Sequence, residues 1–209
     1  GPIVLDSTLS LSYNIAADRT SDKAALITTN EWVTAANPQG MRQVTYRESP
    51  DNGTSWIDGT GLGDAHEVSI TNYNDPSGPG AWFECVGDYD DGGNLHVVWN
   101  EKRHATDPAN LQAAWKHWDR TSGAISTIHL AYYDNPGIGG GRRLNVGLPS
   151  LGFGDGSTLC NGSPNLNYVY MTFVQFGGPT ADQQNDVSAY GYMNGDVYLS
   201  VSNDGGQLW

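Results

Sequence analysis

A pattern of four fixed residues occurs twice in this chain of 209 residues, and both copies read S-x-D-x-G-x-x-W. Ser, Asp and Gly in close succession are typical of tight turns. Asp and Ser side chains accept hydrogen bonds from nearby backbone N–H groups, and Gly reaches positive φ without steric cost. The Trp then begins the returning strand, where its ring can pack across the turn. The fixed residues are Ser49, Asp51, Gly53 and Trp56 in the first copy and Ser202, Asp204, Gly206 and Trp209 in the second.

This pattern looks like the Asp box, also called the bacterial neuraminidase repeat, of sialidase-type β-propellers. The resemblance implies an all-β fold built from β-propeller blades, each an antiparallel four-stranded sheet. It also implies that each box is a structural staple on the outside of a blade. Asp51 and Asp204 are therefore not expected to be catalytic acids.

Strand-like segments form three loosely similar units, at residues 24–56, 82–127 and 148–209. In each unit, segments of alternating apolar and polar residues or of β-branched residues precede a turn. In the first and third units this turn is a complete box, and at residues 119–123 of the second unit it lacks the full pattern. We therefore expect a single all-β propeller segment of about three blades. Propellers typically close with 4–8 blades, so three blades are too few for a closed ring. We therefore expect either half of a six-bladed propeller or several copies of the chain that together close one ring.

Charge and composition favour an extracellular module. The net charge is −13, with 18 Asp against 5 Glu and only 3 Lys, and most Asp residues stand beside Gly or Asn in turns. Nucleic-acid binding would need a basic stripe, which is missing, and no apolar run approaches the ~18–20 residues of a membrane helix. We expect a location outside the cell or on its surface, with carbohydrate or another copy of the chain as partner.

One turn has the oxygen-rich spacing of a Ca²⁺ loop. Asp88, Asp90 and Asn94 are the candidate ligands, and Gly92 supplies the bend. The segment lacks the terminal Glu of an EF-hand, so a plain hairpin turn is the alternative. No other cofactor is expected.

The two cysteines leave two alternatives. Cys85 and Cys160 could form a disulfide between neighbouring blades, or they could both stay as free thiols. Two sequons, at Asn52 and Asn161, permit N-glycosylation in a host that performs it.

Candidate ligand-binding residues lie in and beside a Gly-rich stretch. Arg142 and Arg143, flanked by glycines, could form an anion-binding loop, with a solvated surface pair as the alternative. Tyr132 and Tyr133 lie near the same stretch and offer rings for a ligand or a partner. Tryptophans within the strand-like runs are instead expected in the core; they are Trp99, Trp115 and Trp118.

The resemblance to sialidases also raises the question of catalysis. That family holds the substrate carboxylate with three arginines and uses a Tyr–Glu pair as nucleophile, with an Asp as acid/base, unlike most glycosidases. Its first arginine usually stands in an Arg-Ile-Pro motif, which this chain lacks, and none of the arginines here maps onto the triad. We therefore favour recognition or assembly, including self-association through open blade edges. The alternative is a fragment of a sialidase-like glycoside hydrolase.

Overall fold

The chain folds into three antiparallel sheets that follow one another along the sequence. The computed structural model describes residues 9–31, 42–56, 67–74, 78–103, 112–132, 146–157, 164–176, 187–190 and 194–209. The first sheet contains β1 (Leu9–Ala17), β2 (Ala24–Glu31), β3 (Arg42–Ser49) and β4 (Val68–Ser69). The second contains β5 (Pro79–Tyr89), β6 (Leu95–Arg103), β7 (Gln112–Asp119) and β8 (Ile125–Tyr132). The third contains β9 (Val146–Phe153), β10 (Val169–Phe176) and β11 (Gly195–Ser202).

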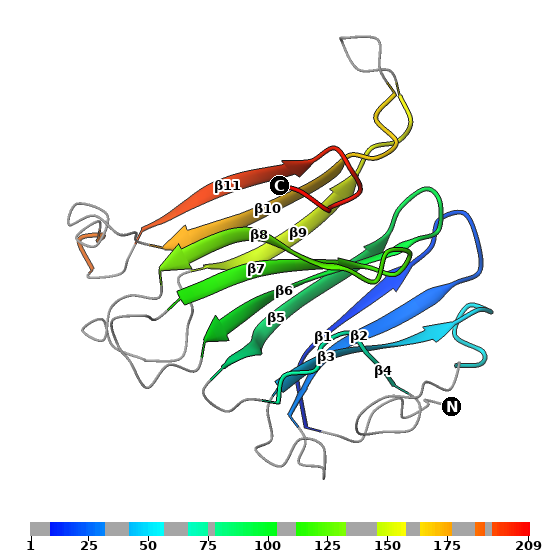
Figure 1. Cartoon of the computed structure of the whole chain (residues 1–209), viewed down its shortest axis with the longest axis horizontal. Coiled ribbons are helices and arrows are strands. Elements are labelled where there is room, and N and C mark those ends of the chain that lie inside the picture. The colour runs from blue at the N-terminus through cyan, green and yellow to red at the C-terminus, as the bar shows by residue number, and fades with distance from the viewer. Residues whose placement is uncertain are drawn as a thin grey trace.

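The three sheets stack face to face in chain order, with the second sheet between the other two (Figure 1). The first strand of the second sheet, β5, contacts the first strands of both neighbours, β1 and β9. Antiparallel sheets arranged around their first strands in this way are β-propeller blades. The predicted all-β class and the number of blades are therefore confirmed. Two blades have four strands, and the third has three among the described residues.

Two hydrophobic clusters hold the stack together, one on each face of the second sheet. Trp99 is fully buried against the first sheet, in a cluster that includes Ile27 and Val44. Trp115, on the opposite face, is fully buried against Met171 and Phe173 of the third sheet. Both faces of the second sheet thus pack against a neighbouring sheet, which explains why its strands β5, β6 and β7 carry apolar residues on both sides, while the edge strand β8 exposes Ile125 and Leu130. The expected core positions of the three tryptophans are confirmed, since Trp118 is also buried.

Two strands extend the units delineated from the sequence. β1 precedes the first unit, which began at residue 24, and β8 continues past the end of the second unit to Tyr132. Both strands complete four-stranded sheets by pairing at an edge, β1 with β2 and β8 with β7. No helix long and apolar enough to cross a membrane occurs in the described part of the chain.

Candidate functional site

Five turns, each containing or directly following an Asp, gather at one end of all three sheets. We call this end the Asp rim and define it by the turns 18–23, 50–56, 90–94, 120–124 and 203–209. Lys23 Nζ donates to Gly93 O at 3.4 Å, which links the rims of the first and second sheets. Gln207 Nε2 donates to Asp119 Oδ2 at 2.9 Å and links the second sheet to the third.

The two boxes form the same turn, each after the third strand of its sheet. In both, the Ser hydroxyl donates to the Asp carboxylate, at 2.9 Å in the first box and 2.6 Å in the second. The same hydroxyl accepts from the Gly N–H, at 2.7 Å and 2.8 Å. Asp Oδ1 then accepts from the backbone N–H four residues on, at 2.7 Å and 3.0 Å. The fixed Ser, Asp and Gly therefore close the turn itself.

Glycine is required in both boxes by the backbone conformation, since φ is +81° at Gly53 and +90° at Gly206. Hydrogen bonds from Ser55 lower the pKa of Asp51, and hydrogen bonds from Ser202 and the Leu208 N–H lower that of Asp204. Both carboxylates are consequently ionised hydrogen-bond acceptors of their own turns.

The incomplete box at residues 119–123 occupies the equivalent place in the second sheet. Asp119 Oδ1 accepts from the Ser122 N–H at 2.8 Å, and the Ser122 hydroxyl donates to Asp119 Oδ2. Gly123, at φ +66°, closes the turn into β8. This turn thus keeps the Asp and Gly but uses a Ser that follows the Asp rather than one that precedes it.

Two candidate Ca²⁺ ligands, Asp90 and Asn94, lie in the turn between β5 and β6, and the third, Asp88, lies near the end of β5. The oxygens of all three accept hydrogen bonds from protein groups. Asp90 Oδ1 accepts from the backbone N–H of Gly92 and Asn94, at 2.9 Å and 2.8 Å. Asn94 Oδ1 accepts from the Thr121 hydroxyl at 2.7 Å, and Asp88 Oδ1 from the Tyr89 N–H at 2.9 Å. In the described part of the chain, no three His, Cys, Asp or Glu side chains group as a metal site would. The Ca²⁺ loop and the plain hairpin turn therefore both stay as alternatives.

The residues predicted to bind a ligand are largely beyond what the structure describes. Arg142, Arg143 and Tyr133 lie outside the described residues, and Tyr132 is the last residue of β8, with no described side chain.

Cys85 is a free, buried thiol in the structure, so the alternative of a Cys85–Cys160 disulfide is not realised there. Its Sγ lies 3.7 Å from Ser12 Oγ, in the packing between the first two sheets. Cys160 and the sequon at Asn161 lie outside the described residues. Asn52, the other sequon residue, donates from its side-chain amide to Asp22 Oδ1 at 2.9 Å.

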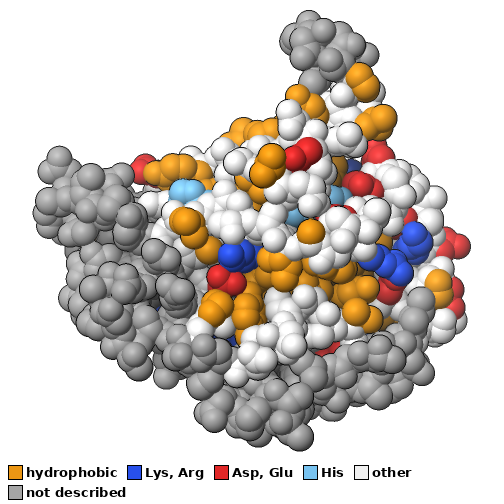
Figure 2. Space-filling view, viewed as in Figure 1, with side chains coloured by type: hydrophobic (Ala, Val, Ile, Leu, Met, Phe, Trp, Pro, Cys, Tyr) orange, Lys and Arg blue, Asp and Glu red, His pale blue; other side chains and the backbone are white. Residues whose placement is uncertain are grey.

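The outer face of the third sheet, which points away from the second sheet, is apolar and exposed. Successive side chains of β11 point to opposite faces of the sheet. Tyr198 points inward and packs on Phe173, with ring centroids 5.5 Å apart. Its neighbours Val197 and Leu199 point outward and are 76% and 61% exposed. Hydrophobic side chains accordingly lie along the β11 margin in Figure 2.

The outer face of the first sheet has a matching apolar strip on β1. Tyr13 and Ile15 are 75% and 57% exposed, whereas their cross-strand partners on the same face, Thr28 and Leu26, are buried. Sequence reasoning missed this strip because it missed β1. The regular alternation of apolar and polar residues from Leu9 to Ile15 is the signal that would have found it.

Comparison of this chain with known proteins gives a match among solved structures. No family model and no curated protein matches it. Among solved structures, it is similar to one described as Hadza microbial sialidase Hz136, with a TM-score of 0.49 and 12% sequence identity. The match covers 94% of this chain but only 32% of that one, so this chain spans about a third of its length.

Proposed function

We propose that this chain is an extracellular Asp-box β-propeller module that acts by recognition. The partner that it recognises is another copy of the chain, so that blades of different copies pack on one another. The observation that carries the proposal is a pair of exposed apolar surfaces at the two ends of the stack, one on the outer face of the third sheet and one confined to β1 of the first sheet. Val197 and Leu199 mark the face of the third sheet, and Tyr13 and Ile15 mark the face of the first.

Packing inside the stack supports this proposal, because each internal sheet face is covered by a neighbouring sheet. The first and second sheets bury one cluster between them, and the second and third bury another. Full burial of a Val or Leu side chain stabilises by about 1.5–3 kcal/mol, so several exposed side chains on one face favour a partner sheet. Such faces on soluble proteins mark interaction sites.

A second copy is the occupant that this chain itself provides. Packing the third sheet of one copy on the first sheet of the next continues the order of sheets within the stack. Such a contact is head-to-tail, and two copies that each use both faces would close a ring with twofold symmetry. This mode of association is face to face, and it is favoured over pairing through strand edges because the apolar side chains point out of the sheet plane.

A cross-linking experiment tests the proposed pairing of faces. All copies carry Cys160→Ser, and the remaining Cys85 is buried. One copy then carries Ile15→Cys and the other Leu199→Cys, and the proposal predicts that mixing them under mild oxidation gives a disulfide-linked heterodimer. The control pairs Leu199→Cys with Leu166→Cys, an exposed leucine in the loop before β10. Equal cross-linking in both mixtures, or in Leu199→Cys alone, would contradict head-to-tail association.

A further inference from the structure

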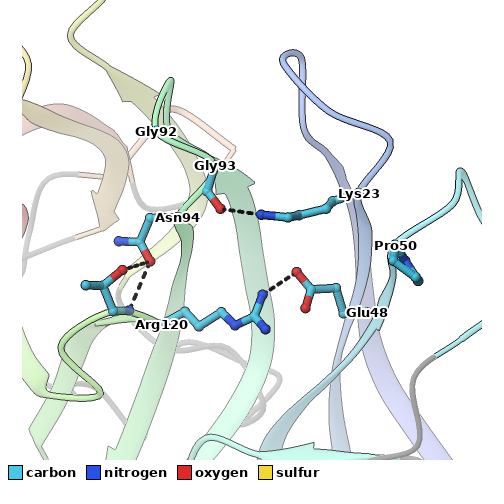
Figure 3. Close-up of a pocket in the computed structure, with 8 residues that line it drawn as sticks. Lys23, Glu48, Pro50, Gly92, Gly93, Asn94 and Arg120 are labelled. Carbon is cyan, nitrogen blue, oxygen red and sulfur yellow. Dashed lines mark hydrogen bonds and ion pairs between the residues drawn. The ribbon is translucent and has the colours of Figure 1, made fainter.

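A pocket of about 470 Å³ opens on the Asp rim between the first and second sheets. Its walls come from the turns and strand ends of both sheets, and Figure 3 shows Lys23, Glu48 and Arg120 converging there from opposite sides. The volume lies in the range typical of sites for small molecules. None of the residues predicted from sequence to bind a ligand lines this pocket, apart from Asn94.

Glu48 is held rigidly at the inner wall of the pocket. It is only 5% exposed, and its Oε1 accepts from the Tyr89 hydroxyl at 3.0 Å and from Arg120 Nη1 at 2.5 Å. Its second oxygen, Oε2, accepts no hydrogen bond from any described residue. This oxygen is therefore available to accept a hydrogen bond from a hydroxyl group of a ligand.

Two cations stand beside this carboxylate. Arg120 uses Nη1 on Glu48, while its Nε and Nη2 meet no acceptor among the described residues and its side chain is partly exposed. Lys23 Nζ makes only a long bond of 3.4 Å, to Gly93 O. The charged side chains lining the pocket therefore sum to a positive charge, although the chain as a whole carries −13. Lys23 and Arg120 favour an anionic ligand, although Asp18 lies close to Lys23 and partly offsets its charge.

We infer that this pocket binds a small hydroxylated carboxylic acid. The ligand carboxylate would lie between Lys23 and Arg120, and a ligand hydroxyl would donate to Glu48 Oε2. Asn94 supports this wall, because its Oδ1 accepts from the Thr121 N–H at 3.0 Å and so ties together two of the turns that form it. The inference is independent of the proposed assembly, since the pocket lies on the rim and the apolar faces lie at the ends of the stack.

Titration with D-glucuronate, followed by ligand-observed NMR, tests the inference. D-glucose and acetate serve as comparison ligands, because each lacks one of the two required groups. We expect saturable binding of glucuronate, and binding at least tenfold weaker for glucose and acetate, since a hydrogen bond to a charged group contributes about 1.5–3 kcal/mol.

Variants then locate the site. Lys23→Ala should weaken glucuronate binding about tenfold, and Glu48→Gln should weaken binding of both glucuronate and glucose while preserving the shape of the side chain. Arg19→Ala is the matched control, because Arg19 is an exposed cation of the same rim that does not line the pocket. Lys23 is partly exposed, so its variant remains informative if Glu48→Gln does not fold. Glucuronate that fails to bind the wild type, or that binds Lys23→Ala and Arg19→Ala equally well, would overturn the inference.

Discussion

His96 Nδ1 lies 2.9 Å from His117 Nε2, and both rings are buried between the second and third sheets. One nitrogen donates and the other accepts, so the contact is incompatible with a proton on both atoms. His117 also contacts the ring of Trp209 edge-on, with centroids 5.4 Å apart. The Asp box of the third sheet therefore packs against a histidine pair of the second sheet.

This histidine pair predicts a pH-dependent stability. Burial and the neighbouring His96 lower the pKa of His117 to about 4, below the value of about 6.5 in an unfolded chain. Between these two values the unfolded state binds more protons, so the free energy of unfolding decreases as pH falls from about 6.5 to about 4. The decrease should be roughly 3 kcal/mol, measured by urea unfolding across this range. In His117→Gln this part of the slope should disappear, and an unchanged slope would refute the assignment.

The fixed glycine of the second box predicts a strong effect of a single methyl group. A Cβ at Gly206 would lie 2.1 Å from His117 Cε1, at φ +90°. We expect Gly206→Ala to destabilise by about 1–2 kcal/mol through the backbone and a further 1–3 kcal/mol through overpacking. Gly205→Ala is the control: φ is +75° there, but nothing lies within 4 Å, so only the backbone cost should appear. Equal urea midpoints for the two variants would show that the contact with His117 is unimportant.

Tyr73 predicts the cost of breaking a buried polar link between the first two sheets. Its hydroxyl donates to Glu101 Oε2 at 2.6 Å and accepts from Trp99 Nε1 at 3.1 Å. Burial and the Glu101 carboxylate raise the pKa of Tyr73, which keeps the phenol protonated as a donor. Tyr73→Phe should destabilise by about 1–3 kcal/mol, because it leaves both partners unsatisfied. Tyr190→Phe, at an exposed tyrosine, should leave the thermal midpoint unchanged.

Much of this fold could be predicted from the sequence because turn chemistry is local. The hydrogen bonds that the fixed Ser and Asp side chains make within each Asp box join residues at most four positions apart, so the fixed Ser, Asp and Gly close the turn through local contacts. Three strands of the second sheet, β5, β6 and β7, were also predicted, since burial on both faces demands apolar residues. The edge strand β8, with Ile125 and Leu130 exposed, was not.

The pocket and the apolar faces could not be predicted in the same way. Glu48 and Arg120 are 72 positions apart, and only the stacking of two sheets brings them together. β1 was not predicted, although apolar and polar residues alternate regularly along it. The exposure of Tyr13 and Ile15 depends on how the sheets pack, which the sequence does not show. Arg142 and Arg143 stay a prediction, because they lie outside the described residues.

The turn between β5 and β6 predicts the response to Ca²⁺. Because Asp90 and Asn94 already satisfy backbone and side-chain donors of the protein, an ion would have to displace those bonds. We expect millimolar Ca²⁺ to leave the thermal midpoint unchanged relative to EDTA. A midpoint that rises with Ca²⁺ and no longer does so in Asp90→Asn would instead establish the Ca²⁺ loop.

The mass of the native species in solution, measured by sedimentation over a range of concentrations, tests the proposed assembly most directly. We expect the wild type to sediment as a species of at least two chains. Leu199→Lys, which places a charge on the outer face of the third sheet, should shift it to a single chain, whereas Leu166→Lys should not. A wild type that sediments as a single chain at every concentration would contradict the assembly of blades between copies.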